Sequence, residues 1–252
     1  MLAEARRQLI KELVFEKKGV KVTELAEKFS VTDETIRRDL NILEKEGVLL
    51  RGYGGAFIQT GVENIIDSDI RKTVYKESKD KIALLCSDLI QNGDVIFLDT
   101  STTAYYVAEK IVNKRLTVLT NSLRIINLYS IYSNIRVVGI GGHFNKSEMG
   151  FFGLNAIKSL NEYFVDKAFI SCRSLSLENG LTESSEEFAE LKTKVINRSK
   201  ESYIIADFSK FENTSFLKVA ELDSITGIIT DKKLSERWHD ELKSKNIRIY
   251  DN

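Results

Sequence analysis

The sequence predicts an α/β protein with an N-terminal winged helix-turn-helix, residues 1–58, and a larger C-terminal doubly wound, mostly parallel α/β domain, residues 76–252. A polar linker over 59–75 joins the two. Two observations carry this prediction. Apolar residues recur at helical spacing up to residue 47 and are followed by a glycine-rich hairpin, and from residue 93 onward apolar strands alternate with helical segments.

Three short helices are expected before the hairpin, over 3–18, 22–29 and 33–46. Thr23 is the expected N-cap of the second helix and Thr32 that of the third, because a threonine oxygen can accept a hydrogen bond from a free amide of the first turn. Ile36, Leu40 and Leu43 form one buried stripe on the third helix. Gly47 is expected to end that helix as the residue after its C-cap.

Two short strands, over 48–51 and 56–58, follow the third helix. The glycines at 52, 54 and 55 between them suit a tight reversal of the chain. Three helices and a hairpin in this order are typical of a winged helix-turn-helix.

The C-terminal part is expected to be a sheet covered by helices on both faces. Its strands, such as Val95-Ile96-Phe97-Leu98, are continuous apolar runs, which indicates burial on both sides and parallel pairing. The expected strands lie over 95–98, 116–119, 136–140, 168–171, 203–206, 227–229 and 247–250, with helices over 102–112, 122–132, 153–162, 185–199 and 235–244 between them.

The third helix has the composition of a DNA recognition helix. Thr35, Arg37 and Arg38 lie off its apolar stripe and in its first two turns, where such helices contact base edges. The guanidinium fork of arginine can bind guanine O6 and N7, or a phosphate, through two hydrogen bonds. Thr32 with the free amides of the helix start, and Arg51 in the wing, are expected to contact the DNA backbone.

The charge balance gives little support to the prediction that the third helix binds DNA. The chain has 37 basic and 37 acidic residues, and residues 1–60 have 11 basic and 10 acidic ones. Two alternatives therefore stay open: the arginines are a solvated helix face, or residues 1–57 dock a protein partner. DNA binding differs from both in that it weakens steeply as salt rises.

A second cluster of polar residues follows the strands of the C-terminal domain. Asp99, Thr100, Ser101, Thr102 and Thr103 connect the strand over 95–98 to a helix start, where free amides and hydroxyls can bind an anion. Ligands of open α/β sheets bind at the carboxyl ends of the strands. Similar loops follow other strands and add Thr120, Asn121, Gly141, Gly142, Asp207 and Lys210. This mixture fits a small polyhydroxylated anion such as a sugar phosphate.

The N-terminal motif resembles the DeoR family of bacterial transcription regulators. The resemblance rests on Thr35-Ile36-Arg37-Arg38-Asp39-Leu40, on Val22-Thr23-Glu24-Leu25-Ala26 before it, and on Gly54-Gly55-Ala56 in the wing. Two positions depart from the family pattern: Tyr53 replaces a histidine, and Ser101 replaces a glycine of the loop after the first sheet strand. Tyr53 keeps a polar tip that can meet a phosphate or sugar of DNA.

The resemblance implies a repressor of sugar-metabolism genes whose C-terminal domain looks like ribose-5-phosphate isomerase and senses a phosphorylated sugar or related metabolite. It also implies that Asp166 and Lys167, which match the family pattern, belong to the effector site. The expected partners are an operator in double-stranded DNA, the metabolite, and further copies of the chain. No cofactor is expected.

A sugar-phosphate isomerase with an appended helical module is the alternative from another class. Asp99, Asp166 or Asp207 would supply its base and Lys167 or Lys210 its electrophile, but no paired-carboxylate pattern requires this, and a shared fold does not establish activity. Cys86 and Cys172 have no metal-ligand spacing, so no metal is expected. No apolar run is long enough to cross a membrane, which predicts a cytoplasmic protein.

Overall fold

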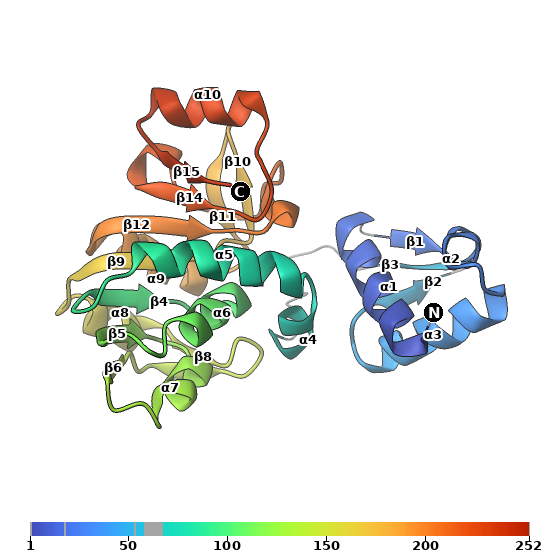
Figure 1. The fold of residues 1–252 in the computed structure, drawn as a ribbon, viewed down its shortest axis with the longest axis horizontal. Coiled ribbons are helices and arrows are strands. Elements are labelled where there is room, and N and C mark those ends of the chain that lie inside the picture. Colours follow the sequence, from blue (N-terminus) through green and yellow to red (C-terminus); the bar gives the residue numbers. More distant parts are fainter. Residues whose placement is uncertain (1, 18, 53, 58–67, 252) are drawn as a thin grey trace. The chain divides into compact units, whose positions relative to one another are not determined.

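The computed structural model describes residues 2–17, 19–52, 54–57 and 68–251, which fall into two units, Met1–Tyr75 and Lys76–Asn252 (Figure 1). Most of the segment expected to be a linker lies outside the described residues. The part that is described contains a short helix, α4 (Ser68–Thr73).

The first unit is a winged helix-turn-helix. Its elements are α1 (Ala3–Lys17), β1 (Gly19–Lys21), α2 (Val22–Phe29), α3 (Asp33–Lys45), β2 (Leu50–Gly52) and β3 (Gly55–Phe57). Ile36, Leu40 and Leu43 are fully buried in its core, as their spacing predicts. The expected caps of α3 are confirmed: Thr32 accepts a hydrogen bond from the Thr35 amide at 3.3 Å, and Gly47 has a φ of 72°.

Two details of this unit differ from the sequence prediction. Thr23 is not an N-cap, because α2 begins at Val22 directly after β1 and its N-cap is Lys21. The wing is a three-stranded antiparallel sheet in the order β1-β3-β2, and β1, with three residues, is too short to show an alternating pattern. Gly55 is required there, because a Cβ atom on it would collide with the Val20 carbonyl of β1.

A buried ion pair joins α1 to α3. Arg6 Nε lies 2.6 Å from Asp39 Oδ2, and the side chains are only 8% and 3% exposed. Arg7 Nη1 approaches the other oxygen, Asp39 Oδ1, at 3.5 Å. The carboxylate thus fixes α3 against α1 on the side opposite to the exposed residues Arg37 and Arg38.

The second unit is built on a seven-stranded parallel sheet with the strand order β15-β14-β12-β9-β4-β5-β6. This confirms the doubly wound parallel prediction. The strands are β4 (Val95–Leu98), β5 (Leu116–Thr120), β6 (Ile135–Gly139), β9 (Val165–Ile170), β12 (Ser199–Ile205), β14 (Gly227–Ile229) and β15 (Arg248–Tyr250). The helices are α5 (Lys76–Leu89), α6 (Thr102–Lys110), α7 (Leu123–Tyr129), α8 (Leu154–Leu160), α9 (Glu186–Asn197) and α10 (Glu236–Ser244).

Alternate residues of the central strands are buried on opposite faces. Ile96 and Leu98 pack in the core formed with α5, α6 and α7, whereas Phe97 between them is 1% exposed and lies outside that cluster. In Figure 1, α5 and α6 lie side by side along the sheet. The second face is covered by α9, which contacts both β9 and β12 and packs against α8. Burial on both faces explains the continuous apolar runs.

Five short strands described in the second unit were not expected from the sequence. β7 (His143–Asn145) pairs with β8 (Gly150–Phe152) in a hairpin, and β10 (Ser174–Ser176), β11 (Gly180–Glu183) and β13 (Leu217–Ala220) form a small antiparallel sheet. Each has only three or four residues, which is too few for periodicity to separate strand from loop. In the described part of the chain, no helix is long and apolar enough to cross a membrane.

The ion pair between α1 and α3 makes a testable prediction for the first unit. Asp39→Ala leaves the buried Arg6 guanidinium without its carboxylate, so we expect the unit to lose about 3–5 kcal/mol of stability. Hydrogen exchange of the α1 and α3 amides in the full chain measures this loss. Trp238, the single tryptophan, lies in the second unit, and its fluorescence should report unchanged unfolding there. Unchanged amide protection would refute the structural role of Asp39.

Candidate DNA interface and effector site

The exposed face of α3 carries the predicted DNA-contacting arginines. Arg37 and Arg38 are exposed, while Ile36, Asp39 and Leu40 beside them are buried, so the two guanidinium groups project away from the core. Their position in the first half of a capped helix suits entry into the major groove.

The two threonines at the start of α3 lie together. The Thr32 and Thr35 hydroxyls are 2.9 Å apart and hydrogen-bonded at the exposed helix start. Thr32 is therefore both the cap of α3 and a candidate phosphate contact. Arg51, on β2, is also exposed. Tyr53 lies outside the described residues.

Asp99 organises the loops at the carboxyl ends of the parallel strands, here called the carboxyl edge. It is 2% exposed, and its Oδ1 accepts a hydrogen bond from the Ser101 amide at 2.9 Å. Its Oδ2 accepts another from the Ser171 amide at 2.9 Å. One carboxylate therefore ties the loop after β4 to the loop after β9, which is the neighbouring strand.

The loop after β4 leads straight into α6. Ser101 is the N-cap, and its Oγ accepts a hydrogen bond from the Ala104 amide at 3.1 Å. Thr102 and Thr103 are buried in the first turn. Thr100 packs against Gly150 of the β7–β8 hairpin so closely that a Cβ atom on the glycine would collide with it. This loop therefore places hydroxyl groups at a helix start, which is a common position for an anion site.

Thr120 and Asn121 form the next loop along the carboxyl edge. Thr120 Oγ1 accepts a hydrogen bond from the Ser122 amide at 3.0 Å, and Asn121 Nδ2 donates to the Phe151 carbonyl at 3.0 Å. Asn121 Oδ1 is buried with no hydrogen-bond partner among the described residues. Gly141 and Gly142 follow β6 on the same edge, and Gly142 lies so close to the Phe152 carbonyl of the hairpin that a Cβ atom would not fit.

Asp207 and Lys210 follow β12, on the other side of β9. Asp207 caps a 3-10 turn (η1, Phe208–Lys210) by accepting hydrogen bonds from the amide and the hydroxyl of Ser209. Asp231, after β14, accepts a hydrogen bond from the Phe208 amide at 2.8 Å. The turn is thus hydrogen-bonded to one carboxylate at the end of β12 and to another at the end of β14.

Two charged residues that sequence reasoning missed complete the carboxyl edge. Lys192 of α9 forms an ion pair with Glu183 of β11, and its Nζ lies 4.0 Å from Asp99 Oδ2. All three side chains are largely buried, at 13%, 6% and 3% exposure. The signal was present in the sequence: at 100° per residue, Lys192 falls in the middle of the apolar stripe of Phe188, Ala189, Leu191, Val195 and Ile196.

The electrostatics of this cluster follow from burial and charge. Burial alone lowers the pKa of Lys192, but Glu183 and Asp99 together raise it above its ordinary value. Burial raises the pKa of the Cys172 thiol to about 12, with Lys192 and Lys210 opposing the rise and Glu183 and Asp207 adding to it. Cys172 therefore lies among four charged residues of the carboxyl edge and stays a neutral thiol at physiological pH.

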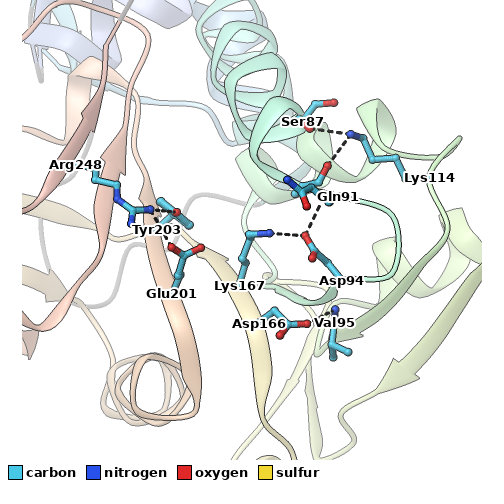
Figure 2. A network of polar contacts seen from close by, with 11 residues as sticks. Ser87, Gln91, Asp94, Val95, Lys114, Asp166, Lys167, Glu201, Tyr203 and Arg248 are labelled. Carbon is cyan, nitrogen blue, oxygen red and sulfur yellow. Dashed lines mark hydrogen bonds and ion pairs between the residues drawn. The ribbon is translucent and has the colours of Figure 1, made fainter.

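Asp166 and Lys167 lie elsewhere. Both belong to the amino-terminal half of β9, away from the carboxyl edge. Figure 2 shows that Asp166 Oδ2 accepts a hydrogen bond from the Val95 amide at 2.9 Å and that Lys167 Nζ lies 2.6 Å from Asp94 Oδ2. The structure therefore does not bring these two residues together with Asp99, and it gives both of them contacts that stabilise the start of β4.

No group of three or more His, Cys, Asp or Glu side chains is placed to hold a metal ion in the described ranges.

The chain matches two family models. The DeoR-like helix-turn-helix domain covers residues 6–61, and the DeoR C-terminal sensor domain covers residues 75–232. The chain belongs to the DeoR family. It is a DNA-binding transcription regulator, and the relation to the family inferred from its sequence motifs is confirmed.

Relatives and a solved structure extend the comparison. The HTH-type transcriptional regulator YulB of Bacillus subtilis is 38% identical over 99% of this chain and 96% of its own length. The glycerol-3-phosphate regulon repressor of Escherichia coli is 29% identical over 90% of each chain. Ribose-5-phosphate isomerase A of Methanocaldococcus jannaschii is similar over 54% of each chain, with 22% identity and a TM-score of 0.40.

The buried cluster around Lys192 makes a prediction for the second unit. Lys192→Met leaves Glu183 and Asp99 without their cation, so we expect about 3–5 kcal/mol less stability at neutral pH. Because the folded-state pKa of Lys192 is raised, its contribution is fully present below its ordinary pKa of 10.5 and is lost as pH rises through the higher folded value.

Urea unfolding followed by Trp238 fluorescence between pH 7 and pH 11 measures both effects. Lys200→Met, an exposed lysine at the start of β12, is the matched control and should unfold like the parent protein. A Lys192→Met protein as stable as this control would rule out the ionic role of Lys192.

Proposed function

We propose that this protein represses genes of sugar metabolism and releases its operator when a phosphorylated sugar or a related metabolite binds the carboxyl edge. The observation that supports the proposal is that the loop Asp99–Thr103, Asn121, Asp207 and Lys210 all follow strands of the parallel sheet at its carboxyl edge. This set combines amides and hydroxyls for a phosphate with carboxylate and amide oxygens for sugar hydroxyls. A relative that is named as the repressor of a glycerol-3-phosphate regulon supports the same chemical class.

In this proposal α3 lies in the major groove of the operator. Arg37 and Arg38 contact base edges or phosphates, Thr32 and Thr35 contact the backbone, and Arg51 approaches from the wing. A homo-oligomer places several such helices on a repeated operator. Tyr53 remains a proposed backbone contact from its place in the wing sequence.

The metabolite shifts binding only if it has different affinities for the DNA-competent and DNA-incompetent states. We therefore propose two states of the oligomer that differ in how the DNA-binding units are presented, with the segment 59–75 as the connection. Asp166 and Lys167 have no part in the proposed site, since their contacts lie at the amino ends of β9 and β4.

We propose further that the carboxyl edge binds its ligand without converting it. The relatives over the whole chain are named as transcription regulators, which supports binding without turnover. Incubation of the full-length protein with pentose and hexose phosphates, followed by product analysis, tests this point. Conversion that disappears in Lys210→Ala would establish the isomerase alternative.

For the DNA interface, we expect Arg37→Ala and Arg38→Ala each to weaken operator binding by about 1–3 kcal/mol. The physical reason is the loss of a bidentate or phosphate contact from an exposed guanidinium. Fluorescence anisotropy with labelled operator at several salt concentrations measures the change. Arg237→Ala, an exposed arginine on α10, is the matched control. If both variants bind operator as tightly as this control does, α3 is not the recognition helix.

For the effector site, we expect Lys210→Ala and Thr102→Ala to abolish the metabolite response while operator affinity stays unchanged. Loss of a hydrogen bond to a charged ligand costs about 1.5–3 kcal/mol, so Lys210→Ala should bind roughly ten- to a hundredfold more weakly. Calorimetry with pentose, hexose and glycerol phosphates measures affinity. Lys200→Ala, at the opposite end of β12, is the control. Equal affinities in all proteins would place the ligand elsewhere.

A further inference from the structure

Asn41 lies on the exposed face of α3, in line with the predicted DNA contacts. It follows Arg37 by four residues and Arg38 by three, and both separations bring side chains to the same side of a helix. At 100° per residue, Asn41 falls between the two arginines when α3 is viewed along its axis. Asn41 is exposed, as are Arg37 and Arg38.

Arg51 of the wing contacts Asn41. Arg51 Nη1, from β2, donates a hydrogen bond to Asn41 Oδ1 at 3.3 Å. The Arg51 amide donates a second bond, to Glu44 Oε1 at 2.9 Å, so the backbone of β2 is also fixed to α3. A contact made through the asparagine oxygen leaves the amide nitrogen as the donor on the other side of the group.

The chemistry of this pair suits base reading. An asparagine amide matches the N6 donor and N7 acceptor of adenine, and its oxygen has a second lone pair for the N6 group. The Arg51 guanidinium uses one N–H group on Asn41 and has others that can bind a phosphate. The hydrogen bond between Arg51 and Asn41 is exposed and adds little to the free energy of unfolding. Stability of the fold therefore does not account for this contact.

We propose that Asn41 reads an adenine in the operator and that Arg51 is the positioning residue that orients its amide. The inference rests on the proposed placement of α3 in the major groove. Asn41 lies about 6 Å along the helix axis from Arg37, at about 1.5 Å per residue. That distance is close to two base steps of about 3.4 Å. Because of this separation along α3, we expect Asn41 to read a base pair different from the one Arg37 contacts.

The test uses the full-length protein and an operator selected from random duplex DNA. Every single base-pair substitution of the half-site is then measured against the parent protein, Asn41→Ala, Arg51→Ala and the double variant. In Asn41→Ala we expect discrimination at one A·T pair to fall roughly 10- to 100-fold while the other positions keep theirs. Arg51→Ala should relax the same pair, and the double variant should discriminate there no worse than Asn41→Ala alone.

Two controls separate this inference from the placement of α3. Asn127→Ala, on an exposed position of α7, removes the same side chain outside the DNA-binding unit and should leave the whole profile unchanged. Arg37→Ala should relax a different base pair. If Arg37→Ala does so while Asn41→Ala keeps the parent profile, or if Arg51→Ala relaxes a pair other than that of Asn41, the base-reading pair is wrong and α3 is still the recognition helix. If neither Arg37→Ala nor Asn41→Ala changes the profile, the placement of α3 fails and the inference fails with it.

Discussion

The carboxyl edge of the sensor depends on the Asp99 carboxylate. Parallel strands bring their carboxyl ends to one edge, but the loops that leave there carry backbone amides that need partners. Asp99 accepts one such amide from its own loop and one from the loop after β9. The carboxylate is buried, so it also needs a cation nearby, and Lys192 lies 4.0 Å away. The position of the loop after β4 relative to the loop after β9 therefore depends on this one carboxylate.

The same anchor limits how the site can attract an anion. Lys192 faces two carboxylates, Asp99 and Glu183, so its charge is largely balanced inside the protein. In the proposed effector site, the positive potential for a phosphate would then come from the amides at the start of α6 and from Lys210. The proposed ligand, with one anionic group and several hydroxyls, matches this division of roles, because the edge contains more carboxylate and amide oxygens than positive charges.

The DNA-binding unit uses a buried carboxylate in a comparable way. Asp39 is on α3, the predicted recognition helix, between Arg38 and Leu40, and its oxygens face Arg6 and Arg7 of α1. The helix is therefore held by a charged contact on one side while its arginines remain exposed on the other. The sequence motif that contains these residues thus combines a structural acid with two candidate DNA contacts. Residue spacing alone does not distinguish the structural acid Asp39 from the two exposed arginines, whereas the burial of Asp39 in the structure does.

Apolar residues at helical spacing and short continuous apolar runs predicted the architecture well, because helices bury one face and the strands of a covered parallel sheet bury both. All seven strands of the parallel sheet were predicted to within a few residues. The carboxyl edge was predicted less completely. Asp99 and Asp207 follow strands directly, so the sequence placed them, whereas Lys192 reaches the edge from the middle of α9. Asp166 and Lys167 were assigned by resemblance, and they lie at the amino ends because β9 begins at Val165.

Net charge was the least informative quantity, and the structure explains why. Residues 1–60 are nearly neutral by count. Yet Arg6, Arg7 and Lys11 of α1 are paired with Asp39 and Glu46, on the side of α3 that packs against α1. The two carboxylates balance most of the charge of these three cations, so the cations add little to the field that DNA would meet. The charges exposed on α3 and β2 are the basic Arg37, Arg38, Lys45 and Arg51 and, in the first turn of α3, the acidic Asp33 and Glu34. The association of such a surface with a polyanion depends on this local distribution and not on the total charge.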